Sequence, residues 1–222
     1  MARPPSTSLH ARPSEGVVLF EAEHRQEALD ATLVEPYARP LLHWRQRLFE
    51  AAVIGQDPGR YEGAGFGNVS VRLPARGDAR PFLVTGTQTG GRESLSLQDL
   101  CVVESWDLSR NRVVSRGLTR PSSESMTHGA LYDRGRDVRF IFHGHAPALW
   151  RAAAKLRLPT THPDAGYGTP EMAREVVVQL RAHPGARVLA MGGHEDGIIA
   201  FGASAHEAGT HLLKLLRELE QK

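Results

Sequence analysis

The chain has 222 residues, of which 41% are hydrophobic and 23% charged, a composition typical of a globular protein with one sizeable core. Its formal net charge is only +2, and no block of lysine or arginine is interleaved with aromatic residues, which argues against nucleic acid and acidic membranes as partners. No stretch is apolar enough for a signal peptide or a membrane span. The single cysteine, Cys101, cannot form an internal disulfide, so we expect a reducing, cytoplasmic setting.

The first part of the chain is expected to form two segments of its own. Residues 1–13 are rich in proline, serine and arginine, which predicts a disordered tail. Residues 14–39 form an N-terminal extension to which the sequence assigns no role. Within this extension, residues 16–21 are a strand candidate and residues 24–33 are a helix candidate.

From Pro40 onward the pattern indicates one domain, residues 40–222. Apolar residues at helical spacing follow Pro40 and stop at Gly55. Strand patterns occur at residues 68–73, 81–87, 99–105, 111–115, 138–145, 186–193 and 197–202. Helical patterns, with N-cap candidates Ser122 or Ser123, Thr169 and Ser204, occur at residues 122–135, 146–156, 169–183 and 204–222. Several strands are joined by short turns without a regular strand–helix–strand rhythm. We therefore expect an α/β (α+β) fold, a three-layer αβα sandwich around a mostly antiparallel central sheet.

The sequence FIFHGH, residues 140–145, ends an apolar strand with two histidines one residue apart. Side chains alternate along a strand, so His143 and His145 project to the same face, with their Cβ atoms about 6.5–7 Å apart. That separation lets both imidazoles bind one ion at about 2.0–2.1 Å. Gly144 leaves the opposite face open to a close contact. Because such a pair also arises by chance, further ligands are needed to indicate a metal site.

Two more residues complete a candidate metal site. His194 follows two glycines at the end of another strand, and Glu124 follows a serine pair at the start of a helix. Three imidazoles and a carboxylate are typical of a catalytic Zn²⁺ site, in which the carboxylate is a ligand or the general base, although Mn, Fe, Co and Ni suit the same ligands. His128 shares a helical face with Glu124, and either orients a ligand or only bonds to a backbone carbonyl.

Three loops are candidates for binding an anion. Backbone N–H groups at glycine turns and helix N-termini attract phosphate or carboxylate, and small hydroxyls add donors. The predicted anion-binding residues, with Arg92 nearby, are Asn68, Thr89, Gly90, Ser122 and Ser123. For each loop by itself the alternative is structural, because glycines also serve tight turns and serines also cap helices.

The order of these motifs resembles the class II aldolase/adducin family, in particular its fuculose-phosphate aldolases. From Pro40 to the C-terminus the motifs run, in unbroken order, GNVSVRL, a Thr/Gly loop, PSSE, DVRFIFHGH and a histidine before GIIAFG. The resemblance implies the same sandwich fold, a homo-tetramer, and a sugar phosphate whose phosphate lies at the anion site. It also implies that His143, His145 and His194 bind zinc, and that Glu124 ligates the resting metal or acts as the acid/base.

Two positions depart from that family's pattern. In the loop PTTHPDAGYG, the position nearest the catalytic tyrosine of the zinc-dependent fuculose-phosphate aldolases is Pro163, and Tyr167, the only tyrosine in reach, belongs to the segment that leads into the next helix. The asparagine before the third histidine is replaced by Gly193. Glu195 and Asp196 follow that histidine and add two carboxylates. His162, Glu195 and Asp196 are therefore the candidates to replace the tyrosine.

The function predicted on these grounds is that of a metal-dependent lyase of the aldolase type. It would cleave a small hydroxy-carbonyl compound or sugar phosphate through a metal-stabilised enediolate, with Glu124 moving the proton. A dehydratase or epimerase on the same metal site is one alternative. A non-catalytic, adducin-like scaffold is another, which is disfavoured because a scaffold has no use for costly histidines that converge at strand ends.

Overall fold

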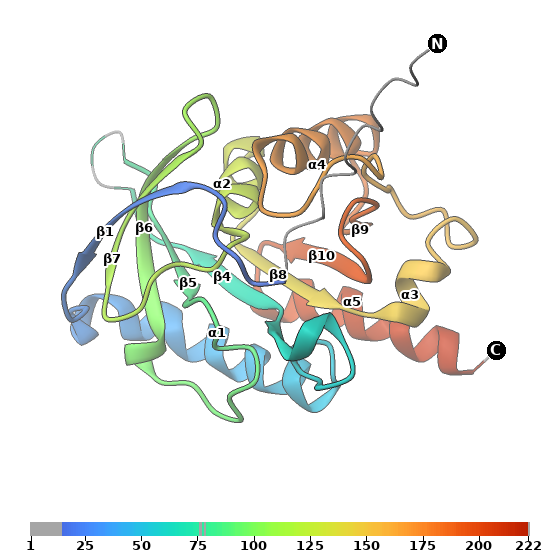
Figure 1. The fold of residues 1–222 in the computed structure, drawn as a ribbon, viewed down its shortest axis with the longest axis horizontal. Coiled ribbons are helices and arrows are strands. Elements are labelled where there is room, and N and C mark those ends of the chain that lie inside the picture. The colour runs from blue at the N-terminus through green and yellow to red at the C-terminus, as the bar shows by residue number, and fades with distance from the viewer. Residues whose placement is uncertain (1–14, 76, 78, 222) are drawn as a thin grey trace, which may run out of the picture.

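A sheet of eight strands forms the middle layer of the structure, a computed structural model that describes residues 15–75, 77 and 79–221 (Figure 1). The tail predicted for residues 1–13 lies outside the described residues. The strand order is β1-β7-β6-β5-β4-β8-β10-β9, in which β1 pairs with β7 in parallel and the other neighbours are antiparallel. These strands are β1 (Glu21–Gln26), β4 (Asn68–Arg72), β5 (Phe82–Thr85), β6 (Leu100–Asp107), β7 (Arg112–Gly117), β8 (Phe140–His145), β9 (Val188–Ala190) and β10 (Gly197–Gly202). The short strands β2 (Gly55–Gln56) and β3 (Gly65–Phe66) pair separately.

Helices cover both faces of this sheet and so make the three-layer sandwich expected from the sequence (Figure 1). One face carries α1 (Ala31–Glu50), α3 (Pro147–Arg151) and α5 (Ala205–Glu220), and the other carries α2 (Ser125–Arg134) and α4 (Pro170–Ala182). A first core lies between the sheet and α1, α3 and α5, and a second core lies between the sheet and α2 and α4. Side chains alternate along a strand, so Phe142 of β8 packs in the first core and Ile141 in the second. Both layers of helices therefore hold β8, which carries the candidate metal ligands, from either side.

The N-terminal extension differs from its predicted elements. Its strand is Glu21–Gln26 instead of residues 16–21, and its side chains are mostly exposed because β1 lies at the edge of the sheet. Helix α1 begins well before Pro40, since Asp30 caps it by accepting a hydrogen bond from the Thr32 N–H at 3.0 Å. The partner that makes residues 21–26 a strand is β7, far away in the sequence. Local periodicity could not reveal that pairing.

The caps of the later helices explain where they begin. Thr169 caps α4 by accepting a hydrogen bond from the Met172 N–H, and Ser204 caps α5 through the Glu207 N–H, both as predicted. The N-cap of α2 is Glu124 and not one of the serines before it, and the Glu124 side chain makes no capping bond. Its carboxylate therefore does not bind the N-terminus of the helix that it precedes. Helix α3 ends at Arg151, before the predicted residue 156, and turns carry the chain onward.

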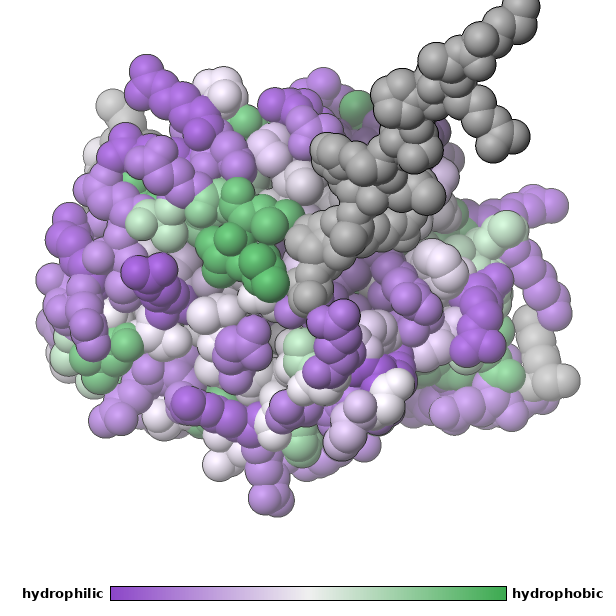
Figure 2. Space-filling model, viewed as in Figure 1, coloured by the Kyte–Doolittle hydropathy of each residue, from purple (hydrophilic) through white to green (hydrophobic). Residues whose placement is uncertain are grey.

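Hydrophilic residues cover most of the face shown in Figure 2, and its largest hydrophobic area lies in the region that the segment before β1 crosses in Figure 1. Within that segment Val17 is 43% exposed. No helix of the described residues is long and apolar enough to cross a membrane. Cys101 on β6 is fully buried opposite Gly117 of β7, and burial raises the pKa of its thiol.

Candidate metal centre and active site

The end of β8 places two histidines on one face of the sheet. Both are buried, because β8 is an inner strand between β4 and β10, and the centroids of His143 and His145 lie 5.3 Å apart. Nδ1–H of His143 donates to the carbonyl of Ile198 at 3.2 Å, which leaves its Nε2 for another partner. Gly144 is required between them, since a Cβ there would lie 2.3 Å from Cγ1 of Val53.

The turn between β9 and β10 brings a third histidine to the same place. The His194 ring centroid lies 4.9 Å from that of His143 and 4.7 Å from that of His145. Gly193 lets this turn lie directly on the backbone of Ala165, because a Cβ at Gly193 would be 1.9 Å from the Ala165 carbonyl oxygen. That contact explains why a glycine precedes the third histidine.

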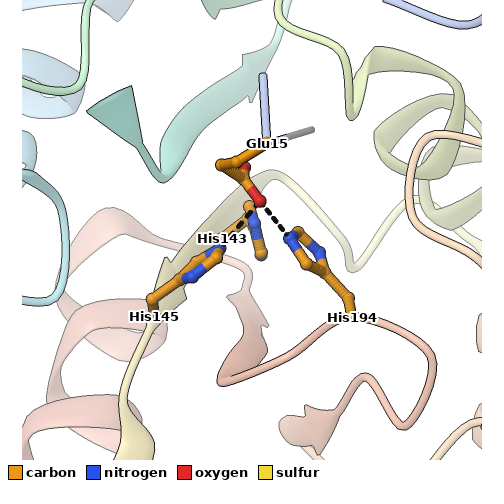
Figure 3. A group of neighbouring side chains, drawn as sticks. All are labelled: Glu15, His143, His145 and His194. Carbon is orange, nitrogen blue, oxygen red and sulfur yellow. Dashed lines mark hydrogen bonds and ion pairs between the residues drawn. The ribbon is translucent and has the colours of Figure 1, made fainter. Parts of the chain in front are cut away.

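A carboxylate from the N-terminal extension completes the group (Figure 3). Oε2 of Glu15 lies 2.7 Å from Nε2 of His194 and 3.7 Å from Nε2 of His145. One ligand atom from each of Glu15, His143, His145 and His194 lies within 4.8 Å of the others. The Glu15 side chain is only 8% exposed, so it is enclosed with the imidazoles.

Glu124 lies beside this group, at the N-terminus of α2. Its Oε1 accepts a hydrogen bond from the Gly168 N–H at 3.1 Å and lies 3.7 Å from Nδ1 of His194. Its other oxygen has no hydrogen-bond partner among the described residues. Burial raises the pKa of Glu124, although His194 opposes the shift. The carboxyl group is thus suited to holding a proton at one oxygen while the backbone fixes the other.

The residues present fit a divalent metal ion. Burial lowers the pKa of His143 and of His145 well below the ordinary value, so both rings are neutral, as metal ligands must be. Burial also lowers the pKa of His194, but the hydrogen bond and charge of Glu15 outweigh it and raise the net value. Among the described residues, Nε2 of His143 and both nitrogens of His145 lack a hydrogen-bond partner. Buried nitrogens without partners are costly unless a further group binds them.

The five predicted anion-binding residues meet in one small pocket next to this group. Asn68, Thr89, Gly90, Ser122 and Ser123 line it, together with glycines of neighbouring loops and with Glu15 and Gly16. We call these five residues the anion cradle. Arg45 of α1 fixes the loop at Thr89, because its guanidinium donates to the carbonyls of Thr89 at 3.1 Å, Gly90 at 2.8 Å and Glu93 at 3.0 Å. Arg92 instead pairs with Asp99.

Comparison with known proteins shows the family of this chain. Residues 60–221 match the family described as Class II Aldolase and Adducin N-terminal domain. This chain belongs to that family. The match confirms the resemblance seen in the order of the motifs.

Relatives of this class II aldolase family member carry the names of aldolases and epimerases. "Probable L-ribulose-5-phosphate 4-epimerase UlaF" of Mycoplasma pneumoniae (strain ATCC 29342 / M129 / Subtype 1) is 34% identical over 107 residues, which cover 46% of this chain and only 41% of that protein. A sugar-phosphate aldolase from Thermotoga maritima has a TM-score of 0.66 at 15% identity, with 85% of this chain and 94% of that chain covered. An L-fuculose 1-phosphate aldolase has a TM-score of 0.59 at 20% identity, with 87% and 85% covered. At these identities the two structures support the fold alone.

The three residues considered as replacements for the family's tyrosine lie in different settings. The His162 side chain is 62% exposed and Glu195 is exposed, whereas Asp196 is buried. Oδ2 of Asp196 accepts a hydrogen bond from the Tyr61 hydroxyl at 2.7 Å, and the Tyr61 ring meets His145 edge-on with centroids 4.5 Å apart. Arg60 donates to the same oxygen at 3.2 Å. Asp196 therefore supports the histidine group through Tyr61.

His128 is not one of the possible metal ligands, although it lies close enough to His143 to lower the pKa of that ring further. Its Nδ1 is 2.7 Å from the Ser70 hydroxyl, which in turn lies 2.7 Å from the Tyr132 hydroxyl. Burial alone lowers the pKa of His128 to about 3. The ring is thus part of a buried hydrogen-bonded chain that joins α2 to β4.

Glu15 and Tyr61 are residues that the sequence analysis missed, and Tyr167, which it set aside, stacks on His194 with ring centroids 4.7 Å apart. Glu15 stands just after the predicted tail, and a single acidic residue there carries no recognisable signal. Tyr61 lies in the glycine-rich stretch DPGRYEGAGFG, and its φ of +50° is rare for a residue other than glycine. Such strained backbone clusters at functional sites, but it becomes visible only in the structure.

Proposed function

We propose that this enzyme is a metal-dependent lyase of the aldolase type that cleaves a small phosphorylated hydroxy-carbonyl compound. One observation carries the proposal: Glu15 belongs to the group of three histidines and also lines the pocket of the anion cradle, so the two sites adjoin. A substrate with a phosphate at one end and a carbonyl near it would span both. Three buried imidazoles and a carboxylate favour Zn²⁺ as the ion, which would polarise the carbonyl and hydroxyl oxygens of the substrate.

The protein's own groups would bind the substrate and move the proton. Asn68, Thr89 and the two serines before α2 offer polar groups to the phosphate, and the backbone N–H of Gly90 adds another donor. Glu124 would carry the proton on the oxygen that has no partner among the described residues, while the Gly168 N–H holds its other oxygen in place. Glu124 and the polar side chains of the anion cradle are buried, which excludes water from the proton transfer.

The variant Glu124→Gln tests this assignment. It should retain bound metal, measured by elemental analysis, and lose about 10²–10⁴-fold in turnover, the usual contribution of a general acid/base. Glu195→Gln is the matched control, since it makes the same charge change at an exposed position beside His194. Full activity in Glu124→Gln would refute the acid/base role. Absence of bound divalent metal in the wild-type protein, with an unchanged melting temperature after chelation, would reject the metal site itself.

The second candidate function is epimerisation of a ketose phosphate. The Mycoplasma pneumoniae relative, named as a probable epimerase, favours it, although the match covers less than half of either chain. The two reactions are separated by incubating ketose phosphates with the enzyme and following the products by NMR. Release of dihydroxyacetone phosphate supports the aldolase, while consumption of substrate with an epimer as the only product rejects it. A dehydratase would instead yield a dehydrated product.

We further propose a homo-tetramer in the cytoplasm. The tetramer is inferred from the family resemblance, and the setting from a single cysteine that is free and buried. Light scattering of the purified protein would test the tetramer, because a monomer mass at micromolar concentration contradicts it.

A further inference from the structure

Glu15 enters the active site from outside the part of the chain that matches the family, residues 60–221. Its carboxylate is hydrogen-bonded to His194 and faces His145, so it lies where an oxygen ligand of a metal bound by the histidines would lie. Glu124 is placed differently, because it approaches the Nδ1 side of His194 and the Gly168 N–H holds it there. Two buried carboxylates thus flank one imidazole from opposite nitrogens.

The segment that carries Glu15 is held over the site by specific contacts, and we call residues 15–20 the N-terminal strap. Gly16 adopts a φ of +75°, and a Cβ there would lie 2.7 Å from Nε2 of Gln88, so this position requires glycine. The Gly16 carbonyl accepts a hydrogen bond from the Thr87 hydroxyl at 3.4 Å. The backbone of Val17 hydrogen-bonds to Tyr167, whose ring stacks on His194.

Beyond Val17 the strap is held more firmly. Leu19 lies against Gly168, and its carbonyl accepts a hydrogen bond from the Asn111 side chain at 2.9 Å. Phe20 is buried in the second core, and strand pairing with β7 starts at Glu21. The strap is therefore anchored at its C-terminal end, while single hydrogen bonds hold the end that carries Glu15.

With the strap in this place, the pocket of the anion cradle is nearly filled. Its volume is about 10 Å³, with Glu15 and Gly16 forming part of its lining. A cavity of that size holds about one water molecule. A phosphorylated substrate can reach the cradle only if the Glu15–Gly16 end of the strap moves away.

We propose that Glu15 is a displaceable metal ligand, through which the N-terminal strap occupies the place of the substrate until the substrate binds. The proposal rests on the proposed metal site. The Glu15 carboxylate takes the position of a substrate oxygen, and the backbone of the strap covers the anion cradle. Metal binding therefore holds the strap in place, and phosphate binding displaces it. Glu124 is then free of the ligand role and is left to move the proton.

The first test is metal affinity, measured with Co²⁺ by its visible absorption in the full-length protein. Glu15→Gln should weaken binding about tenfold or more, the loss expected when a group that contacts the metal site is removed. Glu15→Asp, which retains the charge on a shorter side chain, should bind with intermediate affinity. Glu21→Gln is the matched control, because it makes the same change at an exposed residue of β1. Equal affinity in wild type and Glu15→Gln overturns the proposal.

The second test is hydrogen exchange of peptides that cover the strap. In the wild type, Co²⁺ should slow this exchange and added inorganic phosphate should restore it, whereas in Glu15→Gln the metal should have no effect on it. If phosphate leaves exchange of the metal-loaded wild type unchanged, the strap does not cover the cradle and the proposal fails. If the wild type binds no Co²⁺, the proposed metal site fails with it. Metal binding that is indifferent to Glu15 leaves the proposed function standing and refutes only the strap.

Discussion

Acid should destabilise this protein through His128, and His128→Asn should remove that effect. The His128 ring is fully buried, with its Nδ1 on the Ser70 hydroxyl, and burial lowers its pKa from 6.5 to about 3. Asparagine retains a polar atom near the position of Nδ1 but does not titrate. The two proteins should therefore respond differently to pH.

The sign and size follow from proton linkage. Between pH 6.5 and about 3 the unfolded chain binds a proton at His128 and the folded protein does not, so stability falls as the pH falls through this window. Each pH unit below about 6.5 removes about 1.4 kcal/mol, which amounts to about 2 kcal/mol between pH 7 and pH 5. His128→Asn should lose about 2 kcal/mol less than the wild type over this interval.

Urea unfolding at pH 7 and pH 5, in the presence of a chelator, measures the difference. The smaller side chain leaves a cavity that lowers stability equally at both pH values, so the comparison between pH values isolates the proton. The same exchange at His162, an exposed loop residue, controls for the loss of an imidazole as such. An equal loss of stability in wild type and His128→Asn would refute the reasoning.

Three further substitutions probe the support of the site. Gly144→Ala should lower stability by about 1–3 kcal/mol and weaken Co²⁺ binding, because the new Cβ collides with Val53. Gly185→Ala is the control, since it has free space and should do neither. Equal effects of the two variants in urea unfolding and metal titration would contradict this. In Arg45→Lys the new side chain cannot reach all three carbonyl acceptors of the guanidinium, so the variant should lose about 1–3 kcal/mol of stability and bind inorganic phosphate more weakly, as measured by calorimetry. Unchanged phosphate affinity would show that the loop needs no such anchor. Tyr61→Phe loses the hydrogen bond to its carboxylate partner and should lower stability by about 1–2 kcal/mol in thermal unfolding, and an unchanged melting temperature would count against that bond.

The sandwich fold and the histidine group were accessible from sequence because their signals are local. Alternation along FIFHGH puts two imidazoles on one face, and His194 is marked by two preceding glycines, which let its turn pack on the backbone of residues 161–165. The N-cap Thr169 likewise fixes the start of α4 through a short-range hydrogen bond. Each of these sequence signals lies within a few positions of the residue that it marks.

The contribution of the N-terminal extension was not accessible, because it depends on contacts between distant parts of the chain. Residues 21–26 become a strand only by pairing with β7, and that pairing directs the preceding residues toward the histidines. The side chains of Glu15 and His194 are hydrogen-bonded to each other, although most of the sequence separates the two residues. The apolar pattern carries no information about such a meeting, since neither β1 nor Glu15 contributes an apolar stripe to the core.

The burial of Cys101 has a practical consequence for observing the strap. Its thiol is fully enclosed beside Gly117, and burial raises its pKa, so thiolate for reaction with maleimides is scarce in the folded protein. A cysteine introduced at Val17, which is 43% exposed, would then be labelled selectively without removing the native one. A fluorophore at that single site would report strap movement in real time during metal and phosphate titrations.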